Sequence, residues 1–212
     1  MMDIADGRHF KNPWLSDCVP QLSANEEWKK DLALCMLKLV TILTEKLPSL
    51  TTSDISMYTG LSGIGLFYHR LCSVDRQFIN DSVKSDAVSQ SQKITRRCLR
   101  HVDLDRLYKN VSVFTSPIGA LCLGVLVEDP EHSDVRMTVD MCFEQIISAS
   151  KFAVKTDSAM PDEALYGRTG YLCALLALSS VRRDVPVDVV SSVVRAIIQS
   201  GKDTAKSQEE IF

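Results

Sequence analysis

The sequence predicts an all-α protein in which α-hairpins repeat to form a curved or closed ring. Turns that contain glycine recur along the chain, and each is followed by an apolar segment. One-sided amphipathic segments alternate with these apolar segments, as expected when outer helices cover inner ones. Strand signals are poor, because the β-branched run at residues 111–113 is too short to anchor a sheet. A helical solenoid is the alternative architecture.

The glycine turns mark the repeat. The first contains Gly60 and Gly63, the second Gly119, and the third Gly167 and Gly170. When the turns are aligned on their second glycine, they lie 56 and 51 residues apart, and a period near fifty is typical of repeat architectures. A glycine just before a helix is expected where φ is positive or where no space remains for a Cβ. All five are therefore predicted to be structural turn residues.

The amphipathic segments are predicted to be the outer helices. An irregular arm, residues 1–22, precedes them because Pro13 and Pro20 break any helix there. A capping box at residues 23–26 opens a helix that ends at Leu47. Similar helices are expected over 81–101, over 134–152 and from Pro186 to a C-cap at Gly201, before a polar tail. Their apolar stripes are Trp28, Leu32, Cys35, Leu39, Ile42 and Leu43; Val83, Ala87, Ile94 and Cys98; Val135, Val139, Cys142, Ile146 and Ala149; and Val190, Val193, Val194, Ile197 and Ile198.

The inner segments, residues 61–72, 118–127 and 169–181, are apolar almost all round. A helix of this kind is buried on several sides. The predicted order is therefore outer helix, glycine turn and inner helix, three times over, followed by one more outer helix.

Composition excludes several classes of protein. The net charge is −3 and no basic cluster is larger than two arginines, so nucleic-acid binding is unsupported. No apolar run reaches the length of a transmembrane span, and the first residues lack a signal-peptide apolar region. The seven cysteines are widely spread, which favours reduced core thiols in a cytoplasmic protein.

Three segments resemble the lanthionine synthetase C-like (LanC-like) family, the eukaryotic relatives of bacterial lanthipeptide cyclases. Residues 8–14 (RHFKNPW) are similar to the family's R-x-F-x-N-P-aromatic opening, and residues 58–64 (YTGLSGI) to its first glycine motif. The most specific match is residues 163–171 (EALYGRTGY), with the core E-x-L-Y-G-R-x-G-Y.

The resemblance implies an (α/α) toroid with a central cavity, and a zinc ion held at its mouth by two cysteines and a histidine. Zinc lowers the pKa of a thiol and holds the thiolate ready to react. The implied reaction adds a glutathione thiol to a dehydroalanine or dehydrobutyrine residue of a protein. Zinc and glutathione are thus implied for the full-length family.

The chain departs from the family pattern in three ways. It has no adjacent Cys-His pair where the family has its Cys-His-Gly ligands, it matches only about the first half of the family's length, and Ser116-Pro117 replaces the usual Gly-Asp. We therefore expect residues 23–212 to form an incomplete toroid of about three and a half hairpins. We also expect the chain to be a truncated form with no catalytic residue, no metal ligand set and no cofactor of its own.

Individual polar residues give weak site signals. Arg8 is the one candidate for substrate binding, since an arginine near the cavity mouth could pair with a glutathione carboxylate. Arg168 is expected to cap a helix end or to pair with Asp162 or Glu163. His69 is expected to be a core or rim histidine.

The cysteines give equally weak signals. Cys122 and Cys173 are expected to pack as small core residues. The pairs His69/Cys72 and Cys98/His101 are each only half a zinc site.

Three functions follow from these observations. The first is the glutathione-adding enzyme implied by the family, with this chain an inactive part of it. The second is a non-catalytic interaction module, in which a partner protein or the missing C-terminal half covers the open edge of the ring. The third and weakest is a glycoside hydrolase, which needs a pair of carboxylates across the cavity.

Overall fold

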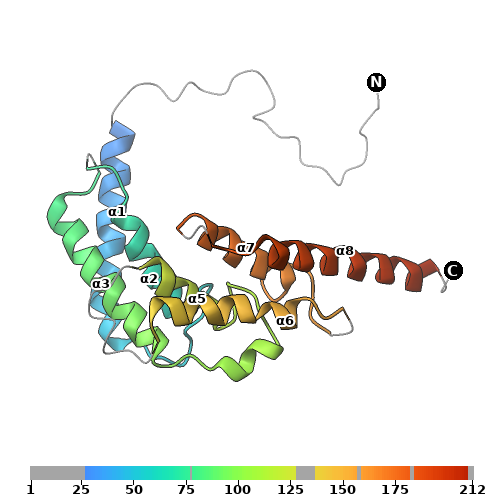
Figure 1. Cartoon of the computed structure of the whole chain (residues 1–212). Coiled ribbons are helices and arrows are strands. Elements are labelled where there is room, and N and C mark those ends of the chain that lie inside the picture. Colours follow the sequence, from blue (N-terminus) through green and yellow to red (C-terminus); the bar gives the residue numbers. More distant parts are fainter. Residues whose placement is uncertain (1–26, 77, 128–136, 157–158, 182–183, 210–212) are drawn as a thin grey trace, which may run out of the picture.

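The computed structural model describes residues 27–76, 78–127, 137–156, 159–181 and 184–209, and these are helical or irregular with no strand (Figure 1). The predicted all-α fold is confirmed. None of the described helices is both long and apolar enough to cross a membrane. In chain order the elements are α1 (Glu27–Lys46), the 3-10 helix η2 (Leu47–Ser49), α2 (Leu61–Leu71), α3 (Asp81–Leu99), the 3-10 helix η3 (Leu104–Tyr108), α4 (Ile118–Leu126), α5 (Val139–Ser148), α6 (Ser150–Ala153), α7 (Arg168–Ser179) and α8 (Val187–Glu209).

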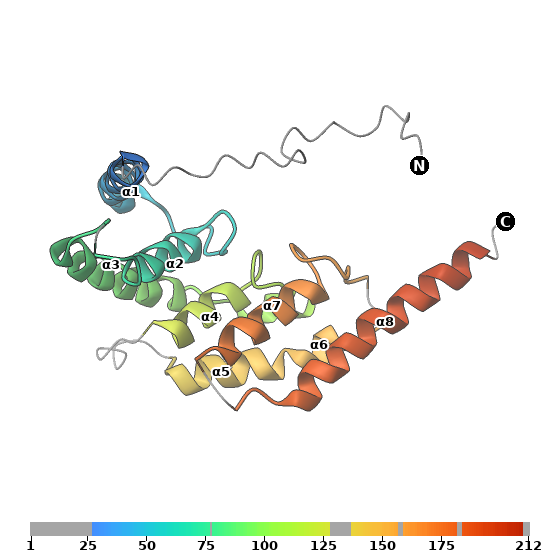
Figure 2. The same cartoon turned by 90° about the horizontal axis from the view of Figure 1, so that it is seen from above.

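The inner helices α2, α4 and α7 begin within one residue of their predicted starts. α4 packs against both α2 and α7, so the three form a row with α4 in the middle (Figure 2). The burial of each inner helix depends on its place in this row. Every residue from Ile118 to Val125 of α4 is buried, whereas Leu176 of α7 is 73% exposed. An inner helix is therefore buried on all sides only when another inner helix packs on each side of it. Among α2, α4 and α7, α4 has two such neighbours.

The outer helices cover this row, as predicted. α3 packs against α2, α5 against α4, and α8 against α7 and α6. The predicted stripe residues Ala87, Ile94 and Cys98 of α3 are buried, as are Cys142 and Ile146 of α5. The predicted stripe of α8 is only partly correct, because Val193 is buried while Val194 and Ile198 are exposed.

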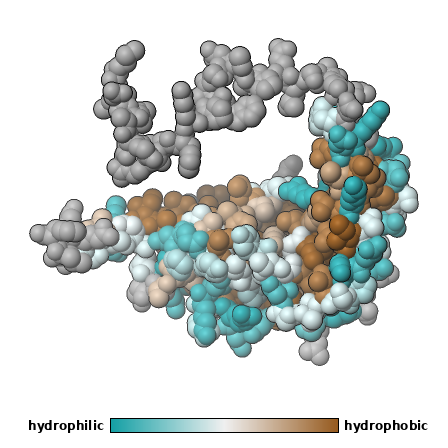
Figure 3. All heavy atoms as spheres, turned by 180° about the vertical axis from the view of Figure 1, so that it is seen from behind, coloured by the Kyte–Doolittle hydropathy of each residue, from teal (hydrophilic) through white to brown (hydrophobic). Residues whose placement is uncertain are grey.

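The predicted apolar face of α1 is wrong except at Leu43. Met36, Val40 and Leu43 pack against the core formed by α2 and α3. Most of the predicted stripe is exposed instead: Trp28, Leu32, Cys35, Leu39 and Ile42. The apolar residues of α1 cover a wide arc, and helical spacing does not reveal which part of that arc meets the core. Figure 3 shows the resulting apolar surface at the α1 end of the molecule and along α7 and α8.

Two predicted helix ends are also wrong. The helix predicted over 134–152 begins at Val139, where the Thr138 hydroxyl caps it by accepting a hydrogen bond from Met141 N (3.2 Å). It is divided at Ala149 into α5 and α6. Gly201 is not a C-cap, because α8 continues through it to Glu209. The capping box at 23–26 and the arm at 1–22 lie outside the described residues.

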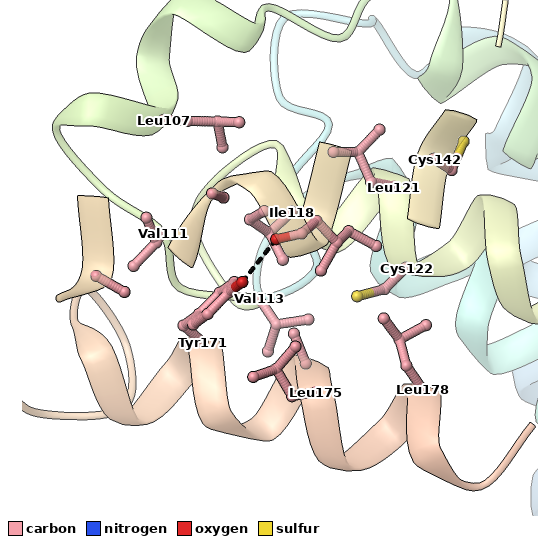
Figure 4. Close-up of a cluster of buried hydrophobic side chains, with 14 of the residues drawn as sticks. Leu107, Val111, Val113, Ile118, Leu121, Cys122, Cys142, Tyr171, Leu175 and Leu178 are labelled. Carbon is pink, nitrogen blue, oxygen red and sulfur yellow. Dashed lines mark hydrogen bonds between the residues drawn. The ribbon is translucent and has the colours of Figure 1, made fainter. Parts of the chain in front are cut away.

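The larger core cluster joins α4, α5 and α7 (Figure 4). Ile118 and Cys122 of α4 face Tyr171 and Leu175 of α7 across this core, and Leu121 lies on the other side of α4, near Cys142 of α5. The Tyr171 hydroxyl satisfies its hydrogen-bonding capacity by donating to Ile146 O of α5 (2.6 Å). The cluster fixes α7, and with it the third glycine turn, against the second repeat.

Candidate functional site: the rim of glycine turns

The three glycine turns are hydrogen-bonded to one another and form a continuous rim at the starts of α2, α4 and α7. Between the first two turns, the backbone N–H groups of Met57 and Tyr58 both donate to Phe114 O (3.0 and 2.8 Å). Between the second and third, Val113 N donates to Gly170 O (3.3 Å). Side chains add to this second joint, because the Ser112 hydroxyl donates to Ala164 O (2.6 Å) and the Thr115 hydroxyl to Leu165 O.

The turn glycines leave room for a close approach of the backbone. In all three turns the carbonyl oxygen six residues earlier lies over the second glycine. A Cβ there would lie 2.3 Å from Met57 O at Gly63, 2.4 Å from Val113 O at Gly119 and 2.1 Å from Ala164 O at Gly170. None of the described glycines has a positive φ. Lack of space, and not backbone conformation, therefore explains glycine at these positions.

A carboxylate closes the first turn. Asp54 Oδ1 accepts from Ser56 N (2.8 Å), and Oδ2 accepts from the Thr59 hydroxyl (2.7 Å). Partial burial by itself would raise the pKa of the Asp54 carboxyl. The hydrogen bonds from Thr59 and Ser56, with the positive charge of Arg106 nearby, more than offset this effect and hold the pKa below its ordinary value. Asp54 is therefore committed to the turn as an ionised hydrogen-bond acceptor.

The Asn110 amide closes the second turn, as the Asp54 carboxylate closes the first. Asn110 Oδ1 accepts from Ser112 N (2.8 Å), and its Nδ2 donates to the Thr115 hydroxyl (2.9 Å). Sequence reasoning missed this parallel, although a signal exists. Residues 54–60 read DISMYTG and residues 110–116 read NVSVFTS, with the hydrogen-bonding Asp or Asn, Ser and Thr at matching places.

The third turn is held by a buried arginine. The Arg168 side chain is fully buried; its Nε donates to Ala153 O (2.8 Å) and its Nη1 to Met160 O (2.6 Å). Nη1 also pairs with Asp162 Oδ1 at 2.7 Å, and Nη2 donates to Lys155 O. Arg168 thus caps the end of α6 and pairs with Asp162, in agreement with the interpretation from the sequence. Its guanidinium is therefore engaged in holding the turn.

The cysteine and histidine candidates do not come together as a metal site. His69 and Cys72 line one cleft, and His101 lines another. The Cys72 thiol donates to Tyr68 O (3.2 Å) in its own helix. Among the described residues, no three His, Cys, Asp or Glu side chains are grouped so as to hold a metal ion. The described residues therefore do not fit the zinc ion that the family implies.

The buried thiols are not prepared for nucleophilic chemistry. Burial raises the pKa of Cys98 to about 11 and that of Cys142 to about 12. It also raises the pKa of Cys122, and Cys173 is half-buried. Burial, together with the positive charge of Arg70, lowers the pKa of His69. The four cysteines act as packing groups, and His69 is half-buried at the edge of a cleft. Arg8 lies outside the described residues.

Carboxylate pairs are also missing from the inner helices. α2, α4 and α7 contain no aspartate or glutamate. A glycosidase mechanism needs two carboxyl groups that flank the sugar bond. The described inner surface therefore gives no support to the glycoside hydrolase alternative.

Comparison with known proteins agrees with the repeat and the rim. The sequence profile of the family described as lanthionine synthetase C-like protein matches residues 51–211. The chain is also 27% identical over 213 residues to a Danio rerio protein named glutathione S-transferase LANCL1, covering 94% of this chain and 49% of the relative. It thus spans about half the length of that relative. Because the match takes in all three glycine turns and their helices, the chain belongs to the lanthionine synthetase C-like family.

Proposed function

We propose that this chain is a substrate-holding part of a glutathione-adding LanC-like protein and does not form the thioether by itself. In the proposed reaction, a glutathione thiol adds across the C=C bond of a dehydroalanine or dehydrobutyrine residue. The sulfur bonds to the β carbon, and the α carbon receives the proton. Membership of the family and the name of the Danio rerio relative support glutathione as the thiol.

The proposal rests on a contrast between two features of the chain. The rim of glycine turns is held together by hydrogen bonds, whereas the buried thiols are unreactive. Thiol addition needs a thiolate held close to its target. The described part of the chain offers no grouped metal ligands that could activate a thiol, and its Cys98 and Cys142 thiols are buried with a raised pKa. The rim, in contrast, fixes three turns side by side through hydrogen bonds. The chain is therefore suited to hold a substrate, while activation of the thiol requires groups outside the described residues.

A peptide assay tests both halves of the proposal. The purified chain is incubated with reduced glutathione, zinc and a dehydroalanine peptide, and the thioether product is measured by mass spectrometry. Binding of the same peptide and of glutathione is measured by titration. We expect binding of the peptide or of glutathione, but no product above the rate without protein. Zinc-dependent product would overturn the non-catalytic half, and failure to bind either ligand would overturn the substrate-holding half.

The second candidate is a stand-alone interaction module. The exposed apolar residues at the two ends of the helix row favour it: Trp28, Leu32, Leu39 and Ile42 in α1, and Val187, Val194 and Ile198 in α8. Exposed apolar residues that gather in a contiguous patch commonly mark a protein–protein interaction surface. Sedimentation and binding of a hydrophobic dye test this candidate. A monodisperse monomer that binds no dye and unfolds cooperatively above about 50 °C would contradict it.

A further inference from the structure

A polar cleft of about 260 Å³ lies where the first and second glycine turns meet. The first turn contributes residues 52–56 and the second turn residues 115–117. The third wall comes from the segment after α3, with His101, Asp103 and Arg106. The structure suggests why this space is open. Pro117 occupies the position that Arg168 has in the third turn, and only Arg168 has a side chain that reaches back to the end of the preceding outer helix.

Most acceptor and hydroxyl groups of the cleft already have partners. Both oxygens of Asp54 accept hydrogen bonds within the first turn. Asp103 Oδ1 accepts from Asp105 N (3.1 Å). The Thr115 hydroxyl donates to Leu165 O, and the Ser116 oxygen accepts from Ile118 N (3.1 Å). The groups of the cleft that remain free to bind a ligand must therefore be hydrogen-bond donors.

The Arg106 guanidinium and the His101 ring supply these free donors. Within the described part of the chain, neither the Arg106 guanidinium nor the His101 ring makes a hydrogen bond or an ion pair. Arg106 acts on Asp54 only through space, where its charge helps to lower the pKa of that carboxyl. A guanidinium in a polar cleft without a bound carboxylate matches a planar acid in shape and charge. The free groups of the cleft thus select a carboxylate.

We propose that this cleft binds an acidic side chain of a peptide, with the carboxylate held by Arg106 and His101. The second oxygen of Asp103 accepts from a backbone N–H of the same peptide. This inference rests on the proposed function in one respect, namely that the ligand is a protein segment. A free small acid would offer the same carboxylate, but it could not use Asp103, because it brings no peptide N–H. An acidic residue near the modified position would then guide protein substrates to the rim.

The test measures fluorescence anisotropy of a labelled peptide that contains one glutamate and neither cysteine nor a dehydro residue. We expect the full chain to bind it, and the variant Arg106→Gln to raise the Kd at least about tenfold, the loss expected for one charge-assisted hydrogen bond. The matched control is Arg100→Gln, because Arg100 is exposed and does not line the cleft. The same peptide with glutamine in place of glutamate should bind as weakly as the Arg106→Gln variant binds the original peptide.

Each outcome has a clear meaning. Equal binding of the glutamate and glutamine peptides, or unchanged binding by Arg106→Gln, would overturn the proposal. Competition by free succinate as strong as that by the peptide would also overturn it, in favour of a small-acid site. Since the assay contains no zinc and no dehydro residue, its result does not depend on whether the thioether reaction occurs.

Discussion

The second and third glycine turns share one backbone contact but are held by different side chains. In both, a carbonyl six residues earlier lies over a glycine at which a Cβ would meet it at 2.4 Å or less. The second turn is closed locally, by Asn110 and Thr115. The third is tied to the preceding outer helix, by Arg168. Backbone packing against glycine therefore defines the repeat, whereas different side chains hold each turn in place.

Replacing Arg168 should have the largest effect on the stability of the fold. In Arg168→Met, the carbonyls of Ala153 and Met160 lose a buried donor, and Asp162 loses its ion pair. We expect a loss of about 3–5 kcal/mol in the free energy of unfolding, as for other broken buried pairs. Urea denaturation measures this loss. Arg168→Lys should lose less, because it keeps the charge but not the fork of donors.

The matched control for this prediction is Arg195→Met. Arg195 is exposed on α8, and the hydrogen bonds found for its side chain go to Ser191 and Ser192 of the same helix. We expect a change within about 0.5 kcal/mol, typical of surface positions. If Arg168→Met were as stable as the unmodified chain, the third turn would not depend on its arginine, and the contrast with the second turn would fail.

Adding one methyl group at a turn glycine should have the next largest effect. In Gly170→Ala, the new Cβ would lie 2.1 Å from Ala164 O and 2.2 Å from Ser112 Oγ, so the backbone must move. We expect a loss on the order of 3 kcal/mol. The double variant Ser112→Gly/Gly170→Ala should be no more stable than Gly170→Ala, because the carbonyl contact remains and the hydrogen bond from Ser112 to Ala164 O is lost. Full recovery in thermal unfolding would mean that the side chain, not the backbone, requires the glycine.

Removing the hydrogen bonds that close the first and second turns should reduce stability by a smaller amount. Asn110→Ala removes the hydrogen bonds to Ser112 N and to the Thr115 hydroxyl, for an expected loss of about 1–2 kcal/mol. Asp54→Asn gives the first turn the residue found in the second, and we expect it to cost less than Asn110→Ala. Unfolding experiments at neutral pH measure both losses.

The Asp54→Asn variant also has a pH signature. The pKa of Asp54 is lowered in the fold, so its ionised form contributes stability above the pKa of the unfolded chain. That contribution is lost as the pH falls through the lower folded value. The stability difference between the unmodified chain and Asp54→Asn should therefore disappear in acid. A difference that persisted unchanged at the lowest pH would show that the carboxylate charge has no role in the turn.

How far the sequence predicted this molecule depended on the kind of signal. The starts of the inner helices followed from the glycines and the apolar runs, which are local features. The exposed face of α1 could not be predicted, because a wide apolar arc does not reveal its partner: Leu43 packs inward while Ile42 is exposed. The cleft at the rim was also missed. It combines Asp54 with Arg106 and Pro117, which lie more than 50 positions later in the chain and meet it only because the turns pair.

The smallest predicted effect has the opposite sign and concerns the glycine that the sequence placed wrongly. Gly201 lies inside α8, and a Cβ there would meet nothing within 4 Å. Gly201→Ala should therefore add helix propensity without a steric cost, a gain of about 0.5–1 kcal/mol at most. We expect higher helical ellipticity and equal or slightly higher stability, in contrast to the loss for Gly170→Ala. Destabilisation by Gly201→Ala would mean that this glycine ends a helix after all, as the sequence predicted.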